Sequence, residues 1–293
     1  MPTIRQVQTY WQAHPAGEAE VTHLATDRRG FFEERDRQTR LLYPSLDADY
    51  GFARAQGKRT LEVGCGMGYN AQRLAQQGAC LIVMDLAHRA VLLTRERLLL
   101  RNLSAAFLVA DAEHLPFAPD VFMMVFSSGV IHHSPNTVQA AREIVRALQA
   151  GGEATVMVYN RNSRWFWWNI VVVLGVLMWL LNNLPEGSRE RLLNSRPDWR
   201  DLMLPAGQPL RFADVVRAGT DFGGLRNPLS RVYTKRSTRR LLFGLVNFRY
   251  VTQFNCFRAL DEMPSLLVLL VRRVLAWLDR RWGWFLIVHA EKS

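Results

Sequence analysis

The sequence predicts an α/β fold in which helices cover both faces of a mostly parallel sheet. Short apolar runs that read as strands alternate with helix-like segments over residues 58–160. A glycine-rich turn at residues 64–68 joins the first of these runs to the first helix. The length of 293 residues and an apolar content of 49% suffice for one large core of this kind.

The predicted elements follow one another at short spacing. The first strand is expected at residues 60–63. The helix after the glycine turn is expected to end at Gly78, because glycine commonly follows the last helical residue. The later elements are placed by the same alternation of patterns. They are strands at 79–84, 106–110, 122–127 and 153–159, and helices at 90–103 and 136–148.

Four segments organise the chain. They are a helical lid at 1–57, the core at 58–160, a cap insertion after the fifth strand at 161–232, and a C-terminal part at 233–293. The last part is expected to hold a helix at 234–246 and strands at 248–257 and 284–290. Those two strands would complete a doubly wound sheet of seven strands.

Charge and cysteine content narrow the classes of protein. The formal net charge is +11, which favours anionic partners such as nucleic acid, acidic lipid head groups or charged small molecules. Only three cysteines occur, and none forms a CxxC pair, which argues against a disulfide framework and a structural zinc site. The N-terminal residues lack the apolar core of a secretory signal, so we expect a cytoplasmic protein.

Residues 165–181 form an apolar block of 17 residues without a charge. A transmembrane helix needs about 17–25 such residues, so length alone decides nothing. A single crossing would separate the two C-terminal strands from the sheet that they complete. Two interpretations remain: a buried or partly buried cap over the site, which we favour, and a helix lying in a membrane surface.

The glycine turn carries the strongest functional signal. An acidic residue closes the first strand, and glycines then alternate with other residues before a helix. The run is Glu62, Val63, Gly64, Cys65, Gly66, Met67 and Gly68. Glycine suits a backbone that turns sharply and approaches a ligand closely. Its G-x-G-x-G spacing differs from the G-x-G-x-x-G of dinucleotide-binding turns, but a turn alone could serve either kind of ligand.

With three later motifs, this run resembles class I S-adenosylmethionine-dependent methyltransferases, especially the small-molecule branch that includes ubiquinone and menaquinone biosynthesis enzymes. Asp85 ends the second strand, Asp111 ends the third, and residues 127–133 follow the fourth. The resemblance covers residues 58–160 and implies a Rossmann-like fold, S-adenosylmethionine as cofactor and S-adenosylhomocysteine as product. The chain departs from the family at Met123, where an Asp is usual, and at residues 149–150, where Lys-Pro is usual.

The resemblance also implies roles for individual residues. Asp85 would hold the ribose hydroxyls, Asp111 would receive the adenine amino group, and the end of the fourth strand would lie beside the methionine part. Alternatively, Asp85 could be a turn residue, Asp111 an N-cap, and Glu62 a cap of the glycine loop. The residues expected to bind the cofactor are Glu62, Gly64, Cys65, Gly66, Gly68, Asp85, Leu86, Asp111, Ala112, Glu113, Ser127 and Ser128.

Two histidines are the candidate catalytic residues. His132 or His133 could act as a general base, since the unperturbed pKa of histidine is about 6.5, or could brace the loop before Pro135. Methyl transfer mainly requires an acceptor held in line with the methyl donor, so one base is sufficient. No metal-ligating cluster accompanies the histidines. The residues expected to contact the acceptor are Tyr10, Trp11, Tyr159 and Asn160.

The apolar and aromatic composition of the cap indicates a lipophilic acceptor, and its arginines suggest that this acceptor carries an anionic group. The same composition suggests contact with a membrane surface. The net charge suggests RNA as an alternative acceptor, but no Asn/Asp-Pro-Pro-Tyr motif follows the fourth strand and no RNA-binding module is recognisable. A second alternative is a sensor or membrane-associated scaffold that binds the cofactor without transferring a methyl group. A cofactor-dependent rearrangement is a third. The sequence fixes neither the methylated atom nor the oligomeric state.

Overall fold

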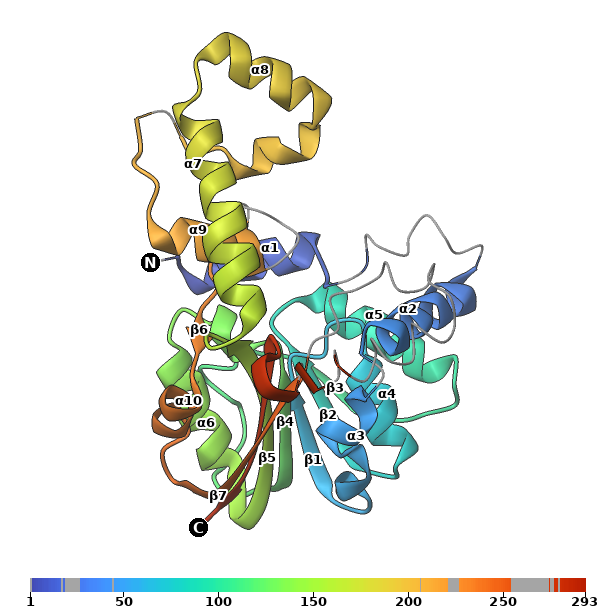
Figure 1. The fold of residues 1–293 in the computed structure, drawn as a ribbon. Coiled ribbons are helices and arrows are strands. Elements are labelled where there is room, and N and C mark those ends of the chain that lie inside the picture. Colours follow the sequence, from blue (N-terminus) through green and yellow to red (C-terminus); the bar gives the residue numbers. More distant parts are fainter. Residues whose placement is uncertain are drawn as a thin grey trace.

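The structure is a computed structural model. It describes residues 2–16, 18, 27–43, 45–205, 207–220, 227–253, 274, 277–278 and 280–293. Figure 1 shows a central sheet with helices on both faces and a helical projection that rises from one end of the strands.

The sheet has the order β3-β2-β1-β4-β5-β8-β7, with the short β6 paired to β5. Its strands are β1 (Arg59–Val63), β2 (Cys80–Asp85), β3 (Ala106–Val109), β4 (Phe122–Ser128), β5 (Leu148–Asn160), β6 (Val232–Tyr233), β7 (Leu245–Gln253) and β8 (Phe285–Lys292). Strands β1 to β6 pair in parallel, and β8 runs antiparallel to both β5 and β7. The predicted mostly parallel, doubly wound fold is confirmed, with the two-residue β6 added to the seven strands.

Helices pack on each face of this sheet, and four of the described helices precede its first strand in the sequence. The N-terminal ones are α1 (Ile4–Ala13), α2 (Arg28–Leu42), α3 (Leu46–Tyr50) and η1 (Phe52–Ala55). Those that connect strands are α4 (Tyr69–Gln76), α5 (His88–Leu99), η2 (Ile131–His133), α6 (Thr137–Ala147) and α10 (Lys235–Leu241). In Figure 1, α4 and α5 lie on the side opposite α6 and α10.

Each face of the sheet therefore has its own hydrophobic core. On β4, Val125 belongs to the core beneath α6, whereas Met124 and Phe126 belong to the core beneath α4 and α5. Because both faces are covered, the central strands read as continuous apolar runs and not as an alternating pattern.

The C-terminal part has the predicted order of elements but differs from the prediction in several boundaries, since β8 ends at Lys292 and not at residue 290. The helix expected at 234–246 ends at Leu241, and β7 already begins at Leu245. Gly244 has φ +97°, a conformation that reverses the chain between the two elements. Residues 254–257 of the expected strand, Cys256 among them, lie outside the described residues.

The insertion after β5 forms the helical projection of Figure 1. Its first helix, here called the cap helix, runs from Trp165 to Asn183 as η3 (Trp165–Leu174), a π-helix, followed by α7 (Gly175–Asn183). It continues through α8 (Glu186–Ser195), η4 (Pro197–Leu202) and α9 (Phe212–Thr220). The cap helix is partly buried, as the favoured interpretation allowed, but only 22% of its most apolar window is inside the molecule.

Candidate active site

The glycine loop lies at the carboxyl end of β1, where parallel α/β sheets bind ligands. Gly64, Gly66 and Gly68 have φ of +79°, +51° and +78°, a left-handed conformation that other residues rarely adopt. A Cβ on Gly64 would lie 2.1 Å from Cγ2 of Val130, in the loop after β4. The absence of a side chain at Gly64 therefore lets these two loops meet.

Asp85 fixes the loop from the end of the neighbouring strand β2. Its Oδ2 accepts a hydrogen bond from the Gly66 amide at 3.0 Å, and its Oδ1 accepts one from the Ala87 amide at 2.9 Å. Burial raises the pKa of the Asp85 carboxyl, and these amide donors oppose the rise. Each carboxylate oxygen has two lone pairs, so the group can accept further bonds from ribose hydroxyls.

Glu62 and Ser127 bring buried polar atoms without partners to the same edge. Neither carboxylate oxygen of Glu62 nor the hydroxyl of Ser127 has a partner with ordinary hydrogen-bond geometry among the described residues. Burial, and next the charge of Asp85, raise the pKa of Glu62 well above its usual range, while the charge of Arg97 and then Asn70 oppose the rise. Buried polar groups are normally paired, so unpaired ones mark a place for a polar ligand.

Asp111 and Glu113 lie in the loop after β3. Asp111 Oδ1 accepts a hydrogen bond from the Glu113 amide at 2.9 Å, and burial raises its pKa. Glu113 Oε1 accepts bonds from the Ser134 hydroxyl at 2.8 Å and the Asn136 amide at 2.6 Å. The loop after β3 is thereby tied to the loop that carries the two histidines. Ala112, which lies between Asp111 and Glu113 in the sequence, is buried.

These two acidic residues also lie near His114, with one ligand-type atom from each within 4.8 Å of the others. Their carboxylates are already held by the backbone and by Ser134, and His114 is exposed. The cluster is therefore part of the loop and carries no metal assignment.

His132 and His133 lie in an aromatic group beyond β4. The His132 ring centroid is 4.3 Å from that of His133 and 4.2 Å from that of Tyr159, and Tyr159 stacks on Trp284 at 4.5 Å. His132 is fully buried, and neither ring nitrogen has a hydrogen-bond partner among the described residues. Burial, and then the nearby His133, lower the pKa of His132 well below its usual range.

The cap insertion holds His133 in place, because the Nδ1–H of His133 donates to the Leu229 carbonyl at 2.7 Å. A ring nitrogen that meets a carbonyl must carry the proton. This bond makes the Nδ1-protonated form of His133 the one present.

Helix α1 lies over this edge of the sheet. Gln8 Nε2 donates to the Leu86 carbonyl at 3.0 Å, and Gln12 Oε1 accepts from the Arg89 amide at 3.1 Å. The Trp11 ring contacts that of His133 at 5.0 Å, and Tyr10 contacts Trp11. Of the residues expected to contact the acceptor, Trp11 therefore contacts the ring of His133 and Tyr159 contacts that of His132. Tyr10 contacts the ring of Trp11.

Two other expected residues have structural partners, and a third is buried in the glycine loop. Asn160 Nδ2 donates to the Gly283 carbonyl at 2.9 Å, and its side-chain oxygen accepts from the Asn162 amide. The hydroxyl of Ser128 lies 2.5 Å from that of Tyr50. Cys65 is buried in the glycine loop, and burial raises the pKa of its thiol. Their roles in binding stay predictions.

Residues of α5 that the sequence analysis did not single out support the glycine loop. Arg97, fully buried, donates to the Met67 carbonyl at 3.2 Å, and Thr94 Oγ1 donates to the Gly66 carbonyl at 3.2 Å. Ala90, Thr94 and Arg97 recur at helical spacing on the buried side of α5. That periodicity predicts that position 97 is buried, but the sequence does not show which residues would pair with an arginine there.

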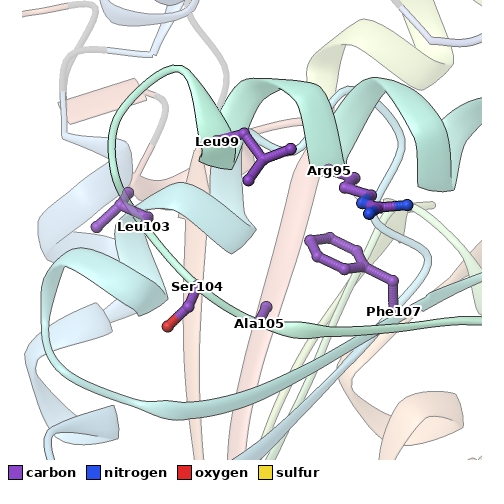
Figure 2. A pocket seen from close by; sticks show the side chains of 6 residues that line it. All are labelled: Arg95, Leu99, Leu103, Ser104, Ala105 and Phe107. Carbon is purple, nitrogen blue, oxygen red and sulfur yellow. The ribbon is translucent and has the colours of Figure 1, made fainter.

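Figure 2 shows a surface pocket at the opposite end of β3. It is lined by Arg95, Leu99, Leu103, Ser104, Ala105 and Phe107. Residues 103–105 precede β3, whereas the glycine loop and the histidines follow the carboxyl ends of their strands. This pocket is therefore separate from the candidate site.

Comparison with known proteins agrees with this geometry. Residues 61–156 match the family model described as a methyltransferase domain. The ubiquinone biosynthesis O-methyltransferase of Azoarcus sp. is 30% identical over 173 residues, which cover 59% of this chain and 71% of that protein. This chain belongs to the class I S-adenosylmethionine-dependent methyltransferases. The predicted enzyme class is thereby confirmed, and membership in this family implies S-adenosylmethionine as the cofactor.

Two further relatives extend the comparison of this methyltransferase. Methyltransferase GfsG of Streptomyces halstedii is 32% identical over 127 residues, and the chain spans only 44% of its length. A solved S-adenosylmethionine-dependent methyltransferase of Thermotoga maritima superposes with a TM-score of 0.50 at 14% identity, covering 98% of this chain and all of that one. The latter likeness shows the fold alone.

Proposed function

We propose that this methyltransferase acts on a small lipophilic acceptor that carries a hydroxyl group. The observation that carries the proposal is His132, a buried imidazole without a hydrogen-bond partner inside an aromatic group at the carboxyl edge of the sheet. The similarity to ubiquinone biosynthesis O-methyltransferases supports an acceptor of this class.

The polar atoms at the edge of the sheet fit the cofactor. The Glu62 carboxylate suits the ammonium group of the methionine part, and Ser127, on the adjacent strand β4, suits a polar contact beside it. Asp85 would hold the ribose hydroxyls and Asp111 the adenine amino group. When bound, S-adenosylmethionine supplies a methyl group already activated on a sulfonium sulfur.

The aromatic group fits the acceptor. Tyr159 and Trp284 form a stacked apolar wall, and Trp11 of α1 covers His133. This lining would bind an apolar ring and exclude water from the reacting oxygen. Burial lowers the pKa of His132, so its ring is neutral near pH 7. A neutral ring has a nitrogen lone pair, which can accept the proton of the acceptor hydroxyl.

The test is transfer from radiolabelled S-adenosylmethionine to a catechol with an isoprenoid tail, compared with the same catechol without the tail. We expect the tailed acceptor to have the lower KM. His132→Gln should lower kcat about 100-fold with little change in KM for the cofactor, since general-base catalysis contributes about that much. The remaining rate should rise with pH as the hydroxyl ionises unaided.

His88→Gln, at an exposed position of α5, is the matched control and should keep the full rate. A His132→Gln enzyme with unchanged kcat, or better use of the catechol without its tail, would contradict the proposal.

A further inference from the structure

The outward side of the cap helix is an apolar surface, here called the cap ridge. Trp168, Val172, Val176 and Trp179 recur every three or four residues and are 60%, 44%, 53% and 57% exposed. Trp167, Val173 and Leu180 beside them are also exposed. No charged residue occurs at 165–185. A contiguous exposed apolar surface of this kind marks an interaction site.

The opposite side of the cap helix is packed, which fixes the direction of the ridge. Phe166, Ile170, Met178 and Leu181 are fully buried in a core shared with α9. A Cβ on Gly219 of α9 would lie 2.8 Å from Ile170 Cγ2, so the two helices are in close contact there. The ridge therefore faces outward because the rest of the helix is anchored to the protein.

Length and composition would allow this helix of 19 residues to cross a membrane, since its most apolar window of 18 residues has a mean hydropathy of 1.7. The topology opposes a crossing. β5 and β6, which flank the insertion, are paired at Asn160 and Tyr233. A bilayer around the cap helix would also enclose α9, which carries the ion pair between Asp214 and Arg217. If only the outward side of the cap helix contacts the membrane, β5 and β6 stay on the same side of the bilayer and the ion pair on α9 stays outside the hydrocarbon.

The charges around the ridge fit an anionic surface. Residues 161–233 contain ten arginines and six acidic residues, and the whole chain has a formal net charge of +11. Arg161 and Arg164, both exposed, precede the cap helix, and the exposed Arg211 precedes α9. A second copy of the chain would bring the same positive charge, so self-association is opposed.

We propose that the cap ridge docks on an anionic lipid bilayer, with its tryptophans at the level of the head groups. Tryptophan favours this interface because its ring is apolar and its N–H is polar. The arginines around the base of the cap helix would meet the lipid phosphates. The helix would lie in the membrane surface, its inner side still packed on α9.

The proposal is tested by flotation of the full-length protein with vesicles of phosphatidylcholine, with and without phosphatidylglycerol. No cofactor or acceptor is added, so failure here leaves the proposed reaction untouched. We expect binding to the anionic vesicles that weakens with added salt, because screening reduces the attraction of arginine to phosphate. Trp168→Gln combined with Trp179→Gln should weaken this binding about tenfold or more, as the apolar contact is lost.

Phe243→Gln is the matched control. Phe243 is 88% exposed in the turn that follows α10, a helix that lies away from the cap helix in Figure 1. Its substitution should leave vesicle binding unchanged. Unchanged S-adenosylmethionine binding and thermal unfolding would show that the double variant is folded, since both tryptophans are exposed.

Three results would overturn the proposal. The first is a wild-type protein that does not float with anionic vesicles. The second is a double variant that floats as well as the wild type. The third is a wild-type dimer in solution that the double variant converts to monomer, because the ridge would then belong to a second copy of this chain.

Discussion

At the scale of single residues, the glycine loop shows how a sequence pattern becomes a site. Gly64 and Gly78 share φ +79°, but their surroundings differ. A Cβ on Gly64 would overlap Val130, whereas a Cβ on Gly78 would meet nothing within 4 Å. Backbone conformation alone therefore constrains Gly78, while Gly64 is constrained by both conformation and space.

Gly64→Ala should consequently abolish cofactor binding, and Gly78→Ala should not. The left-handed conformation costs a non-glycine residue about 1–2 kcal/mol, which both variants bear. Only Gly64→Ala also forces the loops after β1 and β4 apart. Calorimetric titration with S-adenosylmethionine and denaturant unfolding of both variants measure the difference. Equal affinities would mean that the contact with Val130 does not shape the cofactor site.

At the scale of elements, a buried arginine attaches helix α2 to the glycine loop. Arg97 of α5 pairs with Asp36 of α2, and it also donates to Gln72 Oε1 at 2.9 Å and to the Met67 carbonyl. Burial lowers the pKa of Arg97 to about 10, and the charge of Asp36 opposes that shift. The guanidinium therefore stays charged and needs its partner.

Asp36→Asn should destabilise the fold by about 3–5 kcal/mol, because it leaves a buried charge without its counter-ion. Glu96→Gln is the matched control. It removes the partner of Arg28 between the same two helices, but that pair is 48% and 38% exposed and should contribute at most about 1 kcal/mol. Urea unfolding of the full chain compares the two. Similar losses would show that the buried pair is not the stronger attachment.

At the scale of the whole molecule, His289 joins the sheet to the segment before it. On β8, its Nε2–H donates to the Asp49 carbonyl at 2.8 Å, and its Nδ1 accepts from Thr155 at 3.0 Å and from Arg54. Burial, and then the charge of Arg54, lower its pKa to about 4; Arg249 adds to the lowering, while Glu153 and the Asp49 carbonyl oppose it. The neutral ring is thus the form that fits.

Stability should therefore fall as the solution is acidified from about pH 6.5 to pH 4. In this window the unfolded chain, whose histidine pKa is about 6.5, binds a proton that the folded protein excludes. The free energy of unfolding should decrease by on the order of 3 kcal/mol from this residue, and the contribution is fully present above pH 6.5. Unfolding of wild type and His289→Gln across this range isolates the residue. Parallel pH profiles would contradict the assignment.

The sequence by itself determined the order and type of the core elements. Apolar runs long enough only for strands, interrupted by glycine turns, predict the sheet because both signals are local in the chain. Glu62, Asp85 and Asp111 could be placed at one edge for the same reason, since parallel strands bring their carboxyl ends together. The resemblance to the methyltransferase family rested on the motifs that hold these residues, and the comparisons with known proteins confirmed it.

Tertiary structure alone decided what depends on contacts between distant residues. Two such contacts are the ion pair of Arg97 with Asp36 and the packing of Trp11 on His133. A third feature of this kind is that the ring nitrogens of His132 have no hydrogen-bond partner among the described residues. The cap helix is the clearest case. Its composition is apolar on every side, so periodicity could not separate the side that packs on α9 from the ridge. The core shared with α9, in which Gly219 closely approaches Ile170, decided which side is left exposed.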